Sequence, residues 1–300
     1  MHKNNPHNSS YDMTALAAAL PELKPFIMKG QKGQLTLDFS DAKAIKALNK
    51  AILKKDYNID FWDLPDGYLC PPIPGRVDYL YHLNDLVTKP KDRAISVLDI
   101  GTGANLIYPI VGSRAFNWRF VASDIDTIAV NCAKQLVKVN KGLNKQIKVR
   151  QQSDENSIFA NIVHSEDYFD VSLCNPPFHA SQQEAAQGNE RKNKNLNYNK
   201  SKRGSTLKAH KTDQLNFAGT HKELWCEGGE QAFIKKMIEQ SVSVKDQVGI
   251  FTCLVSRKDH LPALYKTLKS VNATMVKTVE MAQGNKVSRF IAWSFYSEED

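Results

Sequence analysis

A short apolar run that leads into a glycine-rich turn is the feature that most constrains this fold. The run from Ala94 to Ile100 predicts a buried strand, and Gly101 and Gly103 follow it directly. Two glycines at this spacing permit a tight turn and a close approach of the backbone to a ligand. In open α/β sheets, nucleotide-like ligands bind beside such a turn. We therefore expect both glycines, and the acid Asp99 just before them, to contact a nucleotide-like ligand.

The next part of the chain alternates between apolar runs and a helical pattern. Strands are predicted at Phe120–Ala122, Ile147–Gln151 and Phe169–Cys174, with a helix at Ile128–Val139. Alternation at this interval predicts parallel βαβ units and a doubly wound sheet. Ligands of such sheets bind beyond the carboxyl ends of the strands. The residues that follow each strand, including 153–156, should therefore share one rim.

Two acids follow the second strand of this predicted sheet. Asp124 and Asp126 lie about 20 residues beyond the glycines, where an acid is placed to hold ribose hydroxyls. The alternative is that an acid here caps the following helix. We assign the ribose contact to Asp124, which sits directly on the strand end, and the cap to Asp126.

The tetrapeptide Asn175-Pro176-Pro177-Phe178 comes directly after the last of these strands. Its residue types suit the methylation of an exocyclic amino group. An Asn oxygen and a backbone carbonyl held by proline can accept the two amino hydrogens. The aromatic ring can stack on a base that has left its helix. Alone, the tetrapeptide could be an ordinary turn that ends a strand.

The order of these motifs resembles that of class I methyltransferases, which use S-adenosyl-L-methionine. Two further stretches, residues 62–79 and 223–230, are similar to the bacterial 23S rRNA adenine-N6 methyltransferases, the ribosomal large subunit methyltransferase F family. The resemblance runs from about Tyr11 to Phe295, except for a polar stretch after residue 178. It implies S-adenosyl-L-methionine as the methyl donor. Asn105 stands where many methyltransferases carry a third glycine, and we keep it as a possible donor contact.

The segment Leu64–Arg76 is rich in proline and glycine and is predicted to be irregular. Its prolines predict a stiff, extended chain that delivers Arg76 to a defined place. The resemblance implies that this place is near the carboxylate of the methyl donor. The alternatives are a surface linker or a phosphate contact.

The fold class that follows is α/β: a Rossmann-like class I methyltransferase with a seven-stranded mixed sheet and a mainly helical N-terminal extension. The extension covers residues 1–92 and the methyltransferase domain covers 93–300. In the extension we expect a frayed start at Met1–Ser10. The predicted helices outside the central units are Met13–Leu20, Asp41–Lys55, Val77–Val87, Glu230–Val242 and His260–Val271. The predicted late strands are Val248–Val255 and the antiparallel pair Thr274–Met281 and Val287–Phe295.

A polar, basic insertion at about 179–222 leaves directly from the Asn-Pro-Pro-Phe motif. Such a composition cannot bury enough apolar surface to order itself, so we expect it to be mobile and to neutralise RNA phosphates. The alternative is a solvated insertion without function. Ser256-Arg257-Lys258, at another predicted strand end, should add phosphate contacts.

Composition agrees with an RNA partner in the cytoplasm. The net charge is +8, which suits a polyanion. The five cysteines have no paired spacing, which predicts reduced thiols in a cytoplasmic protein and no zinc site. The histidines show no ligand spacing, so we expect no metal. No signal peptide or membrane span is predicted, and no obligate protein partner is inferred.

The function predicted is methylation of the N6 amino group of a specific adenine in 23S rRNA, either naked or within a large-subunit assembly intermediate. Three alternatives stay open: guanine-N2 methylation of rRNA, protein-glutamine N5 methylation and non-catalytic RNA binding by a relic of the fold. His179 extends the motif to Asn-Pro-Pro-Phe-His, a form that also occurs in guanine-N2 rRNA methyltransferases.

Overall fold

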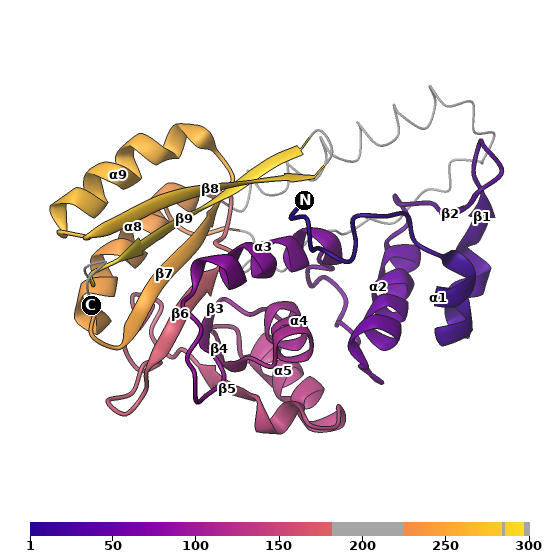
Figure 1. Ribbon diagram of the computed structural model, residues 1–300, viewed down its shortest axis with the longest axis horizontal. Coiled ribbons are helices and arrows are strands. Elements are labelled where there is room, and N and C mark those ends of the chain that lie inside the picture. Colours follow the sequence, from indigo (N-terminus) through magenta and orange to yellow (C-terminus); the bar gives the residue numbers. More distant parts are fainter. Residues whose placement is uncertain (182–224, 284–285, 297–300) are drawn as a thin grey trace.

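A seven-stranded mixed sheet forms the centre of the protein (Figure 1). The computed structural model describes residues 1–181, 225–283 and 286–296. The strand order is β5-β4-β3-β6-β7-β9-β8, and β9 runs antiparallel to both of its neighbours. The other pairs are parallel, so the expected fold class is confirmed. The strands are β3 (Ser96–Ile100), β4 (Arg119–Asp124), β5 (Ile147–Gln151), β6 (Phe169–Cys174), β7 (Val248–Val255), β8 (Met275–Gln283) and β9 (Lys286–Ser294).

Helices cover both faces of this sheet, and alternate residues of its strands pack into two separate hydrophobic clusters. Val97 of β3 packs with one cluster, whereas the next residue, Leu98, packs with the other. This alternation is what a strand that is buried on both faces requires. The helices that contribute to the first cluster include α2 (Ala42–Tyr57), α3 (Ile73–Leu86), α4 (Ile107–Phe116) and α5 (Thr127–Val139). Those of the second are α8 (Gly229–Ser241) and α9 (Leu261–Ser270).

The strand register brings the predicted ligand-binding positions to one rim. Ile100, the last residue of β3, is paired with Ser123 of β4 and with Cys174 of β6. The glycine turn, the acid Asp124 and the residue Asn175 therefore leave three neighbouring strands at the same end. This outcome is the central geometric prediction of the sequence, and the register confirms it.

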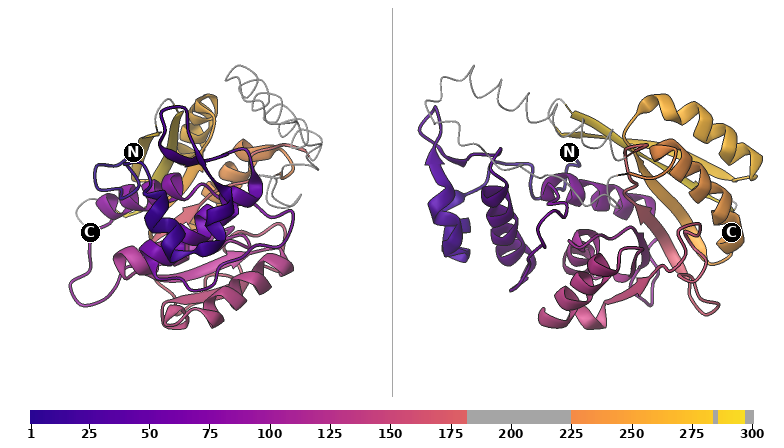
Figure 2. Two further views of the ribbon diagram at one scale, coloured as in Figure 1. Left: turned by 90° about the vertical axis from the view of Figure 1, so that its right-hand side faces the viewer. Right: turned by 180° about the vertical axis from the view of Figure 1, so that it is seen from behind.

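The first part of the N-terminal extension, with α1 (Met13–Ala19), α2 and a small strand pair, lies to one side of the sheet, whereas α3 lies near the centre of the molecule (Figures 1 and 2). Its first long helix, α2, buries Ile45, Leu48, Ile52 and Leu53, the stripe that the sequence pattern predicts. The extension also contains a small antiparallel pair, β1–β2, that the sequence analysis did not predict. The remaining elements are α1 (Met13–Ala19), β1 (Ile27–Lys29), β2 (Leu35–Leu37) and the short 3-10 helices Pro21–Phe26, Leu143–Lys145, Val242–Val244 and Lys258–His260.

Two expectations about the extension are wrong. The start of the chain is not frayed: Asn5 is 3% exposed, and its side-chain amide donates to Asp78 Oδ1 at 3.0 Å. Helix α3 begins at Ile73 and not at Val77, so Arg76 lies on a helical first turn and not on an extended segment. Pro74 is tolerated there because the first turn of a helix has no partner for its amide N–H.

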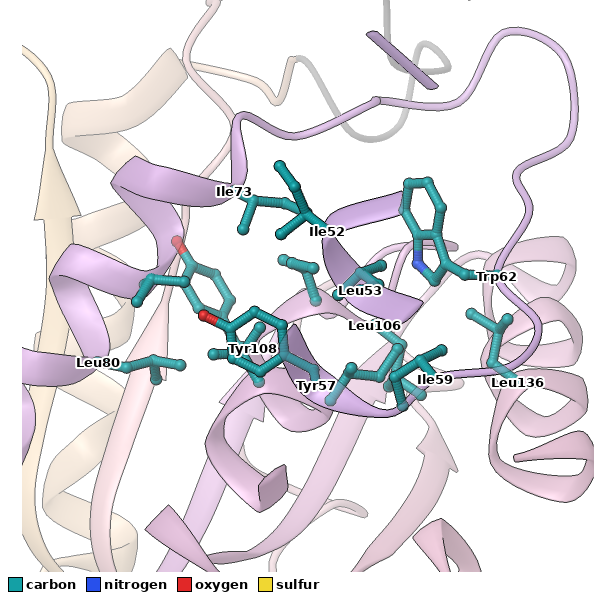
Figure 3. Packing of buried hydrophobic residues seen from close by; sticks show 14 of the residues in the cluster. Ile52, Leu53, Tyr57, Ile59, Trp62, Ile73, Leu80, Leu106, Tyr108 and Leu136 are labelled. Carbon is teal, nitrogen blue, oxygen red and sulfur yellow. The ribbon is translucent and has the colours of Figure 1, made fainter. Parts of the chain in front are cut away.

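One hydrophobic cluster joins the extension to the sheet and its helices (Figure 3). In it, Trp62 and Ile59 of the extension lie among Leu106 and Leu136 of the later chain. The division into two domains near residue 92 stays a prediction. The expected mobility of the basic insertion concerns residues that lie almost wholly outside the described chain. No described helix is long and apolar enough to cross a membrane.

Candidate active site

The glycine turn after β3 is held against the end of β4 by main-chain hydrogen bonds. Gly101 and Gly103 both have positive φ, at 74° and 63°, a conformation that strongly favours glycine. The amides of Gly101 and Thr102 donate to the Ser123 carbonyl oxygen, both at 2.9 Å. Gly101 is exposed and has open space where a side chain would lie. The turn thus leaves room for a ligand to approach its backbone.

The two acids after β4 have different partners. Asp124 accepts a hydrogen bond from the Gly103 amide at 2.8 Å and one from the Asp126 amide at 2.9 Å. Asp126 caps α5, since its carboxylate accepts from the Ile128 amide at 2.8 Å. The predicted cap is therefore confirmed. Burial raises the pKa of Asp124, chiefly against the effect of these amide donors. Its contact with a ribose stays a prediction.

Asp99 is a wholly buried acid at this rim. It is 0% exposed, and neither carboxylate oxygen has a hydrogen-bond partner of normal geometry among the described residues. The pKa of Asp99 is raised to about 7, chiefly by burial and also by the charge of Asp124, against the opposing effects of Thr102 and Arg76. An unpaired buried carboxylate is costly, and a positively charged ligand group at this place would relieve that cost.

Arg76 lies beside Asp99 and offers a second unpaired group. Its guanidinium donates to the Tyr108 hydroxyl at 2.6 Å and stands 5.4 Å from the centre of the Tyr108 ring. Its Nε is buried and has no acceptor among the described residues. Arg76 and Asp99 thus present opposite charges at one place, a combination that suits the carboxylate and ammonium of an amino acid group.

Asn105 has a structural role in the loop that follows the glycine turn. It is 6% exposed, and its side-chain oxygen accepts from the Ile107 amide at 3.1 Å at the start of α4. Its main-chain carbonyl accepts from the indole of Trp62 at 2.9 Å. Whether it also contacts a ligand stays a prediction.

The tetrapeptide 175–178 extends from β6 at the same rim. The side-chain oxygen of Asn175 is buried and has no hydrogen-bond partner among the described residues. Pro176 is buried, Pro177 is partly buried and Phe178 is 36% exposed. The buried oxygen of Asn175 can accept a hydrogen bond from an amino group, and the exposed ring of Phe178 can stack on a flat base that carries this group.

The chain directly after Phe178 is paired with the chain that follows the insertion, a pairing that the sequence patterns did not predict. His179 and Trp225 form a parallel β-bridge, and the Cys226 amide donates to the His179 carbonyl at 3.1 Å. The indole nitrogen of Trp225 is buried and unpaired among the described residues. The only sequence signal for Trp225 was its place in the family-like stretch 223–230.

Glu230, the last residue of that stretch, organises another loop of the rim. It is 1% exposed and accepts from the Ser256 amide at 2.7 Å and from His260 Nδ1 at 2.7 Å. These bonds fix the loop that carries Arg257 and Lys258. Phosphate contacts by those two residues stay a prediction. No three or more His, Cys, Asp or Glu side chains gather in a metal-type cluster in the described part of the chain.

The sheet order, the glycine turn beside an acid and the Asn-Pro-Pro-Phe motif define a class I methyltransferase fold. The comparisons specify the family. A family model described as RNA methyltransferase matches residues 1–297, and the chain belongs to this family of enzymes.

Relatives with high identity span nearly the whole chain. A protein of Colwellia psychrerythraea named ribosomal RNA large subunit methyltransferase F is 50% identical over 99% of this chain and 99% of its own. A protein of the same name from Photobacterium profundum is 49% identical over 99% of this chain and 92% of its own.

Solved structures of human METTL16 share the architecture. The catalytic domain in complex with MAT2A 3'UTR hairpin 1 has a TM-score of 0.80 and 30% identity, and covers 99% of this chain and 96% of its own. The N-terminal domain in complex with SAH has a TM-score of 0.77 and 26% identity, and covers 99% of both chains.

Proposed function

We propose that this protein transfers a methyl group from S-adenosyl-L-methionine to the N6 amino group of an adenine in 23S rRNA. The observation that carries the chemistry is the side-chain oxygen of Asn175. It is buried without a partner among the described residues at the end of β6, beside the strand that carries the glycine turn. The names of the relatives support the choice of ribosomal RNA.

Several features of the rim fit the methyl donor. Arg76 suits the donor's carboxylate, and the unpaired Asp99 suits its ammonium group. The carboxylate of Asp124 suits the ribose hydroxyls, as acids at this place do in related folds. The open backbone at Gly101 admits close approach of the donor. When bound, the donor supplies an electrophilic methyl group on a positively charged sulfur.

The residues of the motif orient the accepting amine. The lone pair of an aromatic amine is delocalised into the ring, so the amine is a poor nucleophile. Asn175 accepts one amino hydrogen and the Pro176 carbonyl accepts the other, which turns the lone pair toward the methyl group. Phe178 stacks on the base after it has left its helix. No strong base is required, because the nitrogen loses a proton after it has become cationic.

An RNA substrate is consistent with the basic chain, which carries a net charge of +8. A METTL16 catalytic domain of the same fold is known in complex with an RNA hairpin. An rRNA substrate also implies a cytoplasmic location. Either naked rRNA or a large-subunit assembly intermediate would present the base, and a methyl-transfer assay on both substrates separates the two.

A methyl-transfer assay tests this function. Unmodified 23S rRNA, free and in partly assembled subunits, is incubated with labelled S-adenosyl-L-methionine, and the digest is analysed by nucleoside mass spectrometry. We expect N6-methyladenosine that disappears with Asn175→Ala. N2-methylguanosine would replace the proposed base, and transfer to protein alone would replace the proposed substrate. Donor binding without any transfer would contradict an enzymatic role.

A further inference from the structure

Trp225 is hydrogen-bonded through the backbone of its segment to the residues that follow the Asn-Pro-Pro-Phe motif. It forms a β-bridge with His179, and the next amide, that of Cys226, donates to the His179 carbonyl at 3.1 Å. Gly229 continues this contact: a Cβ there would meet the main chain of Ala180 at 3.2 Å. Trp225 is therefore held near Phe178 by backbone interactions of its own segment with the residues that follow the motif.

Two buried polar atoms without partners among the described residues lie on these two connected segments. One is an acceptor, the side-chain oxygen of Asn175, and the other is a donor, the indole Nε1–H of Trp225. Buried polar groups are nearly always hydrogen-bonded in folded proteins. Where they are not, a bound ligand that completes the bonds is a direct explanation. An acceptor and a donor together need a ligand that offers a donor next to an acceptor.

The Watson–Crick edge of adenine offers this pair. Its N6 amino group donates and the adjacent N1 accepts. Guanine presents the opposite pattern at these positions, since O6 accepts and N1–H donates. Cytosine offers the adenine pattern at N4 and N3, and guanine offers it at N2 and N3. An indole donor therefore rejects guanine that presents O6 and N1, but not cytosine or guanine that presents N2 and N3.

We infer that Trp225 helps to orient the base by donating its indole N–H to N1 of the target adenine while Asn175 binds the N6 amino group. This inference rests on the proposed function and adds a second protein atom to the reading of the base. A donor that points at N1 rejects guanine placed in the orientation of adenine, because two N–H groups then face each other without an acceptor.

A double-mutant cycle between protein and RNA tests the contact. The protein change is Trp225→Phe, which keeps the aromatic ring and removes the N–H. The RNA change replaces the target adenosine with 1-deazaadenosine, in which a C–H group stands in place of N1. Each change alone should lower kcat/KM by about 10- to 100-fold, the range for one lost hydrogen bond to a buried group. The two together should lower it no further than one alone.

A structural role for Trp225 predicts a different result. The losses would then multiply, which would overturn the inference. Trp62→Phe is the matched control, because the indole of Trp62 donates to the Asn105 carbonyl at 2.9 Å and not to the base in this proposal. In this variant, 1-deazaadenosine should lower kcat/KM by the same factor as in the wild type. Trp225→His keeps a ring N–H, so 1-deazaadenosine should still lower kcat/KM by most of the wild-type factor. An equal kcat/KM for adenosine and 1-deazaadenosine in this variant would also contradict the assignment.

The proposed function and this inference fail in different ways. Wild-type product that is N2-methylguanosine overturns the function, and the inference with it. Wild-type N6-methyladenosine combined with multiplying losses overturns only the role of Trp225. The donor affinity of Trp225→Phe should equal that of the wild type, and a weaker affinity would assign Trp225 to the donor site instead.

Discussion

The indole N–H of Trp62 donates a hydrogen bond of 2.9 Å to the main-chain carbonyl oxygen of Asn105. Trp62 belongs to the N-terminal extension, and Asn105 belongs to the loop that follows the glycine turn. A second bond of this kind joins the Tyr68 hydroxyl to Asp126 at 2.7 Å. The extension therefore supports two loops of the proposed donor site, in addition to carrying Arg76.

Trp62→Phe should weaken donor binding by about 5- to 10-fold, because a buried carbonyl loses its hydrogen bond at a cost of roughly 1 kcal/mol. The turnover number at saturating donor should change less than the affinity does. Isothermal titration with S-adenosyl-L-homocysteine measures the affinity. Phe61→Leu, at a half-exposed neighbour, is the control and should bind as the wild type does.

Asn175→Ala should lower turnover by at least about 100-fold, the scale of losing one hydrogen bond that orients a reacting group. Donor affinity should stay within about twofold, since the proposed role of Asn175 is to bind the acceptor base and not the donor. Single-turnover methylation and donor titration measure the two quantities. Asn84→Ala, in α3, is the control and should keep both. Equal losses of rate and donor affinity in Asn175→Ala would place Asn175 in the donor site.

Asp124→Ala should weaken donor binding by more than about 10-fold, because it removes the proposed ribose acceptor and the bonds to the amides of Gly103 and Asp126. Asp124→Asn separates these roles, since one amide oxygen remains for the glycine turn. We expect an intermediate affinity for Asp124→Asn and little change in the rate at saturating donor. Wild-type affinity in both variants would remove Asp124 from the site.

The ionisation of Asp99 should make donor binding depend on pH. Burial raises the pKa of Asp99 to about 7, so the carboxylate becomes charged between about pH 6 and pH 8. A cationic donor binds the charged form better, and its affinity should rise by up to about tenfold across this range. Asp99→Asn should flatten the profile. A profile that is the same in both proteins would show that Asp99 does not face the donor.

The raised pKa of Asp99 also makes the free energy of unfolding depend on pH. Because the pKa of Asp99 is raised on folding, the folded protein binds more protons than the unfolded chain between about pH 4 and pH 7. Its contribution to the free energy of unfolding therefore falls as pH rises through this window. Urea denaturation without donor at about pH 5 and pH 7.5 should show a smaller decline for Asp99→Asn than for the wild type.

Asn5→Ala should lower the free energy of unfolding by about 1–3 kcal/mol, because it leaves the buried Asp78 with one donor fewer. The same side chain also donates to the Pro74 carbonyl at 3.1 Å. Asn4→Ala changes an exposed neighbour and should stay within about 0.5 kcal/mol of the wild type. Equal midpoints for both variants in urea denaturation would contradict an ordered N-terminus.

Local patterns were sufficient to predict the sheet and its rim. The apolar run before Gly101 and the alternation of strands and helices fix which residues follow each strand, and parallel order then brings Asp124 and Asn175 together. The periodic stripe of α2, from Ile45 to Leu53, is a local signal of the same kind.

Features that depend on distant partners could not be predicted in this way. The polar residues before Ser10 look solvated in sequence, yet Asn5 is buried because Asp78 meets it from far along the chain. Helix α3 begins early because a proline fits its first turn, where sequence reasoning treats proline as a breaker. Trp225 is brought beside the Asn-Pro-Pro-Phe motif by a β-bridge to His179, the residue that follows the motif, and no periodic pattern in the sequence indicates this pairing.

The β-bridge between His179 and Trp225 has a consequence for how this family can diverge. The two ends of the intervening segment are fastened at one point of the fold, and the entropy of closing a loop grows only slowly with its length. Residues can thus be added, removed or exchanged between these ends at small thermodynamic cost to the sheet. The length and composition of the intervening segment can therefore vary among relatives while the rim of the sheet keeps its geometry.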